Sequence, residues 1–243
     1  EETLEGEPVE ESDEFYEEEH DVPSDVLTTK TGNNRFVWNM RYPGAEDIDG
    51  RQILWAGSTT GPKAIPGTYI VQLLINDDVV GEQTFELTKD PRIETTQEDF
   101  QAQFDLHQNI IAKLDTTHKV INQIRDVRSQ INEVKSDNPD DTEIQERADA
   151  VLDVLEEVEG ELMQTKAESY QDVLNFPIKL NNKLASLAST VATGDGRPTQ
   201  QQYEVYFDLS AQIDEQFEKI NQVFEGELPD QIREIEQRTI RLN

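Results

Sequence analysis

Apolar side chains recur at steps of three or four residues for about 40 residues beyond residue 99, and this run constrains the fold more than any other feature. The period places these side chains on one face of an α-helix. A helix of that length is typical of a helical bundle or a coiled coil. Thr95 or Thr96 is positioned to cap its start. The recurring positions are Phe100, Phe104, His107, Ile110, Ile111, Leu114, Thr117, Ile121, Ile124, Ile131 and Val134.

Three further amphipathic runs follow the first, separated by segments that break helices. SDNPDD (136–141) ends the first run, and GDGRPT (194–199) forms a tight loop before the last. Pro177 suits the first turn of the third helix. Because the connections are short, we expect an elongated, mostly up-and-down antiparallel bundle of about four helices over residues 93–243. The main apolar positions are Ile144, Ala148, Val151, Leu155, Val158 and Leu162, then Ile178, Leu180, Leu184, Leu187 and Val191, then Tyr203, Ile213, Phe217, Ile220 and Phe224.

Residues 30–92 consist instead of short segments rich in β-branched and aromatic residues, separated by glycine and proline turns. Phe36, Trp38 and Met40 alternate with their neighbours as in a half-buried strand. We therefore predict an α+β chain in which a small antiparallel β-sandwich, of immunoglobulin or fibronectin type, precedes the bundle. Four strands fall short of the roughly seven of such a domain, so we expect the sandwich to be incomplete and to expose an unpaired edge. The predicted strands are FVWNMRY (36–42), RQILWAG (51–57), TYIVQLLIN (68–76) and EQTFELT (82–88).

The formal net charge is −31 at pH 7, from 52 acidic and 21 basic residues. A field of that sign repels nucleic acid and anionic membrane, so neither is an expected partner. Two explanations stay open: a surface adapted to high salt, or an ordinary fold with an acidic tail. Residues 1–29 are interpreted as an acidic linker or insertion. No apolar run approaches the ~18 residues of a membrane span, so we expect no membrane insertion.

We expect no catalytic, cofactor-binding or metal-binding residues in this chain. The absence of cysteine excludes thiolate metal sites and thiol catalysis. His107 and His118 stand about 16 Å apart on one predicted helix, too far to bind one metal ion. His107 also falls on the apolar stripe, which predicts an interior position. The acidic cluster at residues 156–161 is predicted to be a solvated helix face.

Two groups of residues are candidates for binding. Trp55, beside a glycine-rich loop, and Tyr42 are candidates for contact with a glycan or with a partner protein. The third predicted helix carries a polar, locally cationic strip in an otherwise acidic chain. Hydrogen bonds between helices and relief of acidic charge explain this strip; a docking surface for another domain or protein is the alternative. Its members are Asn175, Lys179, Asn182 and Lys183.

Several long blocks resemble, in the same order, the C-terminal region of large secreted bacterial proteins. Those proteins carry an N-terminal β-propeller of sortilin/VPS10-like or BNR-sialidase-like repeats and are often labelled glycosyl hydrolases. The resemblance covers residues 30 to about 225. The blocks are NRFVWNMRYPGA, ILWAGSTTGPKAIPGTYIVQL, QFDLHQNIIAKLDTTHKVINQIRDVRSQI, QTKAESYQDVLNFPIKLNNKLASLAS and GDGRPTQQQYEVYFDLS.

The resemblance implies that an immunoglobulin-like domain and a helical bundle follow a propeller, in a protein that is secreted or held at the cell surface, extracellular or periplasmic. It also implies that strands upstream of the acidic insertion complete the β-domain. The chain itself contains no propeller repeat, so no catalytic residue can be carried over to it.

These observations predict a non-catalytic structural and interaction region. Its expected role is to dock or space the upstream β-propeller of the same protein, or to mediate assembly with another protein chain. Two alternatives stay open: a contribution to substrate binding in a sialidase-like glycoside hydrolase, and a carbohydrate-binding module.

Overall fold

The computed structural model describes residues 30–50 and 53–227, and the chain divides into two compact units, residues 1–40 and 41–243. The predicted acidic linker, residues 1–29, lies outside the described residues. In the first unit, residues 30–40 contain no helix or strand. Asn34 closes a small turn there, because its side-chain amide exchanges two hydrogen bonds of 3.0 Å with the main chain of Lys30.

The strands predicted at 36–42 and 51–57 were wrong for the residues that the structure describes. Met40 has a φ of 59°, in the left-handed region that interrupts an extended alternation, and Arg41 makes only a single bridge, to Lys63. Residues 51 and 52 lie outside the described residues, and residues 53–57 form no strand. Alternation and aromatic content indicate an extended chain, but they do not show whether another strand pairs with it.

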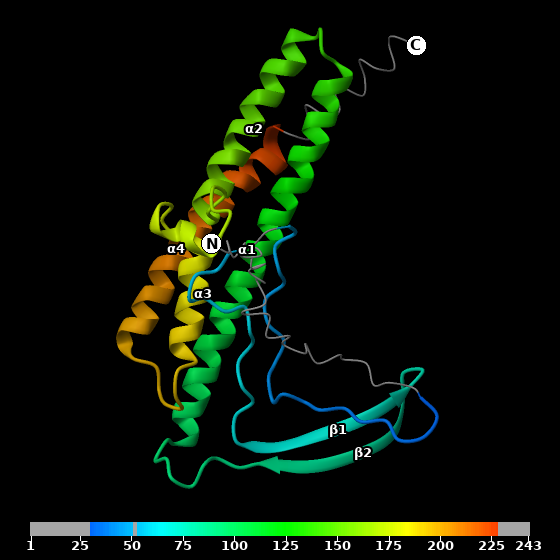
Figure 1. Cartoon of the computed structure of the whole chain (residues 1–243), viewed down its shortest axis with the longest axis vertical. Helices are drawn as coiled ribbons and strands as arrows, with labels where there is room; N and C mark the ends of the chain where they lie inside the picture. Colours follow the sequence, from blue (N-terminus) through cyan, green and yellow to red (C-terminus); the bar gives the residue numbers. More distant parts are fainter. Residues whose placement is uncertain (1–29, 51–52, 228–243) are drawn as a thin grey trace, which may run out of the picture. The chain divides into compact units, whose positions relative to one another are not determined.

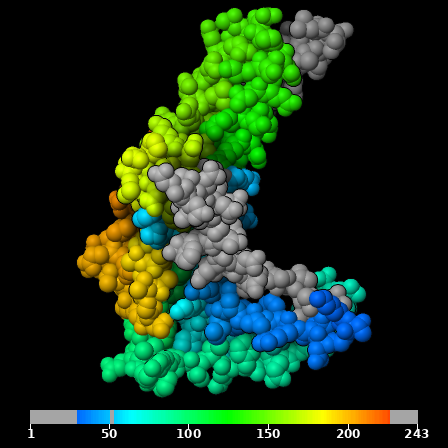
Figure 2. All heavy atoms as spheres, in the orientation of Figure 1, coloured from blue at the N-terminus to red at the C-terminus, as the bar shows by residue number. Residues whose placement is uncertain are grey.

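The other two predicted strands are confirmed and form a hairpin (Figure 1). Strand β1 (Gly67–Ile75) pairs antiparallel with β2 (Asp78–Leu87) through the two-residue loop Asn76–Asp77. Both loop residues have positive φ, 50° and 69°, as in the type I′ turn whose twist suits a hairpin. The described residues thus show a two-stranded sheet and do not show the predicted immunoglobulin-like sandwich. Within the described residues, no further strand pairs with the outer edge of β2, which lies near the bottom of the view in Figures 1 and 2.

A bundle of four α-helices follows the hairpin in the described part of the chain, as predicted. The third helix begins after Lys179, so Pro177 precedes it rather than lying in its first turn. The helices are α1 (Gln97–Asp137), α2 (Thr142–Leu162), α3 (Leu180–Val191) and α4 (Gln200–Gln222), with short helices at Tyr170–Leu174 and Val223–Glu227.

Local side-chain chemistry sets where three of these helices begin. The Thr96 side chain accepts a hydrogen bond from the main-chain N–H of Asp99, and the Asp99 carboxylate accepts one from the main-chain N–H of Thr96. This capping box starts the 41-residue α1. Thr199 and Gln202 form a second capping box at α4. Asp141 caps α2. These side chains satisfy amide groups that the first turn of a helix leaves unpaired.

Helices α2 and α3 follow one another along α1 in the same direction, and α4 returns beside both (Figure 1). The bundle therefore departs from a strict up-and-down order, because residues 163–179 continue along the bundle instead of reversing it. The buried face of α1 is the apolar stripe predicted from the sequence. The core includes Leu106, Ile110, Leu114, Ile121, Ile124, Val151, Leu155, Val158, Leu162, Leu184, Leu187, Ala188, Ile213 and Ile220.

Candidate functional site

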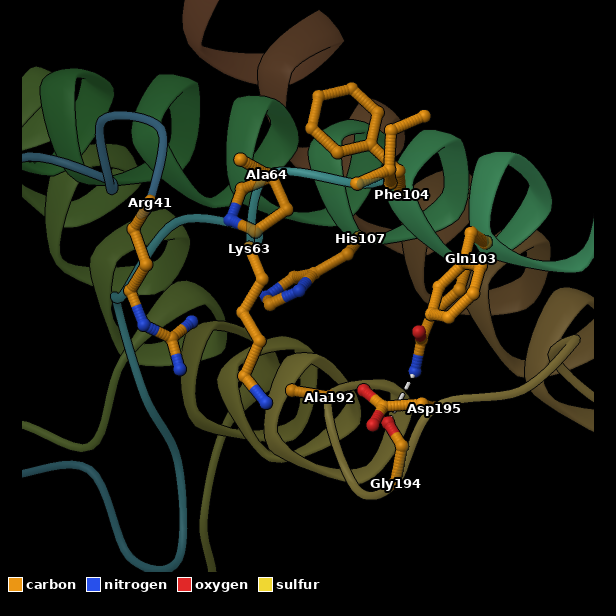
Figure 3. Close-up of a pocket in the computed structure, with 12 residues that line it drawn as sticks. Arg41, Lys63, Ala64, Gln103, Phe104, His107, Ala192, Gly194 and Asp195 are labelled. Carbon is orange, nitrogen blue, oxygen red and sulfur yellow. Dashed lines mark hydrogen bonds between the residues drawn. The ribbon is translucent and has the colours of Figure 1, made fainter. Parts of the chain in front are cut away.

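A small pocket lies between α1, the loop at residues 62–65 and the loop that follows α3 (Figure 3). Its volume of about 60 Å³ leaves room for about two water molecules. Pockets that enclose small organic ligands are usually ~300–1,000 Å³. Lys63 and Asp195 extend toward the same space from opposite sides. The pocket is therefore too small to enclose a sugar ring.

The polar groups around this pocket mainly hold main-chain segments together. Gln103 Nε2 donates hydrogen bonds to the carbonyl oxygens of Val191 (2.7 Å) and Gly194 (3.0 Å), which ties α1 to the end of α3. Arg41 Nη1 donates to the carbonyl of Gly61 at 2.9 Å. These bonds join segments that are distant in sequence, so the polar groups of this pocket stabilise the packing of the fold and do not form a substrate site.

His107 lines the pocket and is buried, as predicted, with 5% of its surface exposed. Its pKa is lowered to about 4, mainly by burial and also by the nearby charge of Arg41, while a hydrogen bond with the main chain of Thr60 opposes both effects. The imidazole is therefore neutral at pH 7.

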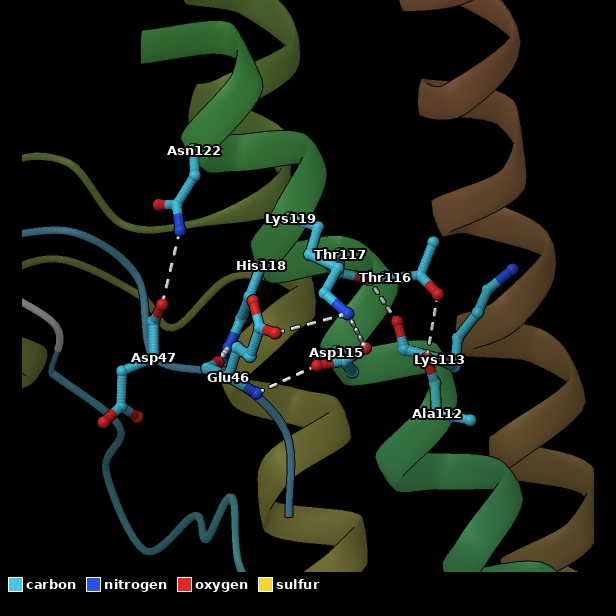
Figure 4. A network of polar contacts seen from close by, with 10 residues as sticks. All are labelled: Glu46, Asp47, Ala112, Lys113, Asp115, Thr116, Thr117, His118, Lys119 and Asn122. Atoms are coloured by element: carbon cyan, nitrogen blue, oxygen red, sulfur yellow. Dashed lines mark hydrogen bonds and ion pairs between the residues drawn. The ribbon is translucent and has the colours of Figure 1, made fainter. Parts of the chain in front are cut away.

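Polar side chains on α1 bind a loop that the sequence predicted as part of a β-sandwich. We call residues 45–50 and 53–58 the docked loop, and Figure 4 shows its contacts at Glu46 and Asp47. Asp115 Oδ1 accepts a hydrogen bond from the main-chain N–H of Glu46 at 2.9 Å. His118 Nδ1 lies 2.6 Å from the carbonyl oxygen of Glu46. Together these two side chains satisfy both main-chain groups of Glu46.

The same row continues along α1. Asn122 accepts from the N–H of Asp49 at 2.9 Å and donates to the carbonyl of Asp47 at 3.3 Å. Arg125 donates to the carbonyl of Asp49. The row has helical spacing, since its members at 115, 118, 122 and 125 are three, four and three residues apart. Sequence reasoning followed only the apolar stripe and missed this polar row beside it.

His118 is fully buried in this network. Because Nδ1 faces a carbonyl oxygen, it must carry the proton as the donor. Nε2 is buried without a hydrogen-bond partner among the described residues. Burial lowers the pKa of His118, while the bond to Glu46 and the carboxylates of Asp47 and Asp115 oppose that shift.

The docked loop then crosses α3. Asn182 accepts a hydrogen bond from the N–H of Trp55 and donates one to its carbonyl, both at 2.8 Å. Ser186 also donates to that carbonyl, at 3.1 Å. Gly57 is needed for this close approach, because a Cβ there would lie 2.7 Å from that of Ala185.

The structure separates the members of the predicted cationic strip. Asn182 is buried and binds the chain's own loop. Lys179 pairs with Glu161 of α2 at 2.9 Å. Asn175 and Lys183 are exposed. These positions favour the explanation by hydrogen bonding and charge relief over an external docking strip.

Replacing Asn182 by alanine is expected to lower the free energy of unfolding by about 2 kcal/mol, because the N–H of Trp55 loses its partner and the carbonyl of Trp55 keeps only its bond from Ser186. Urea denaturation followed by circular dichroism measures this change. Lys183→Ala, the exposed neighbour in the same helix, should change stability by less than about 0.5 kcal/mol. Equal effects of the two substitutions would contradict the assignment.

The two aromatic candidates lie in different surroundings. Tyr42 packs edge-on against Phe104 of α1, with ring centroids 4.8 Å apart. Trp55 is 40% exposed and lies beside Tyr170, with ring centroids 5.9 Å apart. Tyr42 is also 40% exposed, so contact of either residue with a glycan or a partner protein stays a prediction. Tyr170 is a ring beside Trp55 that sequence reasoning missed.

Glu159 corrects the prediction of a solvated acidic face on α2. Its residue is 3% exposed, and its carboxylate binds Arg125 Nε at 2.8 Å and Arg128 Nη2 at 2.6 Å. Both arginines come from α1, so the cluster joins the two helices. Glu157 and Glu161 remain exposed and pair with Lys219 and Lys179.

The hairpin exposes aliphatic side chains on both of its faces. Seven aliphatic side chains in β1 and β2 are about half exposed, between 47% and 60%. They gather on both sides of the turn at Asn76–Asp77. They are Ile70, Val71, Leu73, Leu74, Ile75, Val79 and Val80.

Comparisons with models of protein families, with curated proteins and with solved structures found no match to this chain. Among the described residues, no three or more His, Asp or Glu side chains are grouped so as to hold a metal ion. None of the helices in that part of the chain has the length and apolar character needed to cross a bilayer.

Proposed function

We propose that this chain is a non-catalytic structural and interaction region, in which a helical bundle presents a β-hairpin for pairing with another β-structure. The observation that carries the proposal is the exposed apolar surface of β1 and β2. An isolated two-stranded hairpin is marginally stable in water and normally needs a third strand or a packed face. Exposed apolar patches of this kind mark association surfaces.

The resemblance to secreted β-propeller proteins supports the same proposal. In that setting the hairpin belongs to an immunoglobulin-like sandwich whose other strands come from upstream sequence or from another chain. The bundle would then dock or space the propeller outside the cell.

Binding of short β-strand peptides tests the proposal. Three labelled peptides would alternate valine with lysine, with glutamate or with threonine, and fluorescence anisotropy would report binding to the whole chain. We expect at least one to bind, and Val71→Thr with Leu73→Thr to weaken that binding roughly tenfold, because apolar contact is lost. Val205→Thr, which alters an exposed valine on α4, is the matched control.

Binding of none of the peptides would overturn the interaction role. Circular dichroism of the helices distinguishes a variant that has lost only the apolar contacts of the hairpin from a variant that has unfolded as a whole. Hydrolysis of fluorogenic sialosides or other glycosides by the purified chain would overturn the non-catalytic role.

A further inference from the structure

The two faces of the hairpin differ in chemistry. On one face Tyr69 lies opposite Phe85, with their rings stacked at 5.9 Å, and Val71 and Leu73 continue the apolar row along β1. We call this the apolar face. It follows from the alternation of side chains along paired strands.

The opposite face, here the acidic face, carries Glu82 and Glu86 on β2, beside Ile70 and Leu74 of β1. Glu82 accepts a hydrogen bond from Gln72 across the pair at 2.7 Å, and Glu86 lies opposite Thr68. Neither carboxylate pairs with a cation among the described residues. Asp77 in the turn and Asp78 at the start of β2 add two more carboxylates. No Lys, Arg or His occurs between residues 67 and 88.

Both carboxylates of the acidic face belong to β2, and no other strand of the described residues pairs with the outer edge of β2. A strand added there would place every second side chain beside Glu82, Thr84 and Glu86. The others would lie beside Gln83, Phe85 and Leu87. Opposite charges at neighbouring cross-strand positions stabilise pairing, and like charges oppose it. The acidic edge therefore selects against a second copy of itself.

We propose that the outer edge of β2 binds an extended polypeptide segment in which aliphatic or aromatic side chains alternate with lysine or arginine. The aliphatic side chains extend the apolar face, and the cations lie over Glu82 and Glu86. This inference rests on the proposed function and adds the chemistry of the partner and the edge that it uses.

The valine–lysine and valine–glutamate peptides, titrated against the whole chain at low salt, test this partner. We expect the lysine peptide to bind roughly tenfold more tightly. Glu82→Lys with Glu86→Lys should reverse that order. Glu133→Lys with Asp137→Lys, an equal change of charge at exposed positions on α1, should leave it unchanged. Near 1 M salt the preference should shrink, because charges are then screened within ~3 Å.

Three outcomes would overturn the inference while leaving the proposed function intact. The two peptides could bind equally tightly, or the lysine peptide could still bind more tightly to the Glu82→Lys with Glu86→Lys variant. The third is that the peptides still bind after Thr84→Pro on β2. Sedimentation velocity supplies a further test. A dimer of the unmodified chain that Thr84→Pro disrupts would assign the edge to a second copy and overturn the basic partner. If neither these peptides nor the uncharged threonine peptide binds, the proposed function fails as well.

Discussion

Replacing Glu159 by alanine is expected to lower the free energy of unfolding by about 3 kcal/mol, although the substitution removes a negative charge from a chain of net charge −31. Glu159 is buried and holds two arginines from the neighbouring helix. Its removal leaves both guanidinium groups without this carboxylate. Because Arg125 and Arg128 are about 30% exposed, water compensates in part, and the effect falls at the low end for buried ion pairs.

Glu161→Ala is the matched control for that substitution. Glu161 is on the same helix, and its side chain is 52% exposed where it pairs with Lys179. Exposed pairs of this kind contribute roughly 0–1 kcal/mol. Chemical denaturation of the two variants side by side measures the difference. A loss in Glu159→Ala no larger than that in Glu161→Ala would show that the two arginines do not depend on this carboxylate.

Acid is expected to destabilise the bundle through His107 by about 3 kcal/mol between pH 7 and pH 4. In the unfolded chain this imidazole takes up a proton near pH 6.5, but in the folded chain its pKa is lowered to about 4. Between these values the unfolded state binds more protons, so stability falls as the pH falls. His118 adds to the loss with the same sign, because burial also lowers its pKa.

Comparison with His107→Gln isolates this effect from the titration of the many carboxylates. The unmodified chain should lose about 3 kcal/mol more than the variant over that pH range, as measured by urea denaturation at each pH. An NMR titration gives a direct check, with an expected midpoint near pH 4 for the His107 ring. A midpoint at pH 6.5 or above would refute the buried, neutral assignment.

The helical half of this protein could be predicted from its sequence because its signals are local. The apolar period of α1 selects its buried face, and Thr96 with Asp99 sets its start within one turn. The two strands of the hairpin were also predicted, because apolar alternation acts over a few residues. Their turn was not: the predicted strands left residues 77–81 between them, whereas β2 begins at Asp78 after the turn at Asn76–Asp77.

The docked loop was not predictable in the same way. Trp55 and its neighbours have the composition of a strand, but their main chain bonds to Asn182, which is 127 residues away. Likewise Glu46 bonds to Asp115 across 69 residues. A strand and an extended segment that lies on a helix have similar local preferences, so only the distant partner distinguishes them.

The sequence by itself determined the four helices, the two strands of the hairpin, the apolar face of α1 and the buried position of His107, because periodicity and capping depend on residues close along the chain. Only the tertiary structure decided that Asn182 holds the chain's own loop, that Glu159 is buried between two arginines while Glu161 is solvated, and that β1 and β2 keep their aliphatic side chains exposed. The solvation of a carboxylate, an amide or a strand edge depends on which distant segment covers it, and composition does not specify that segment.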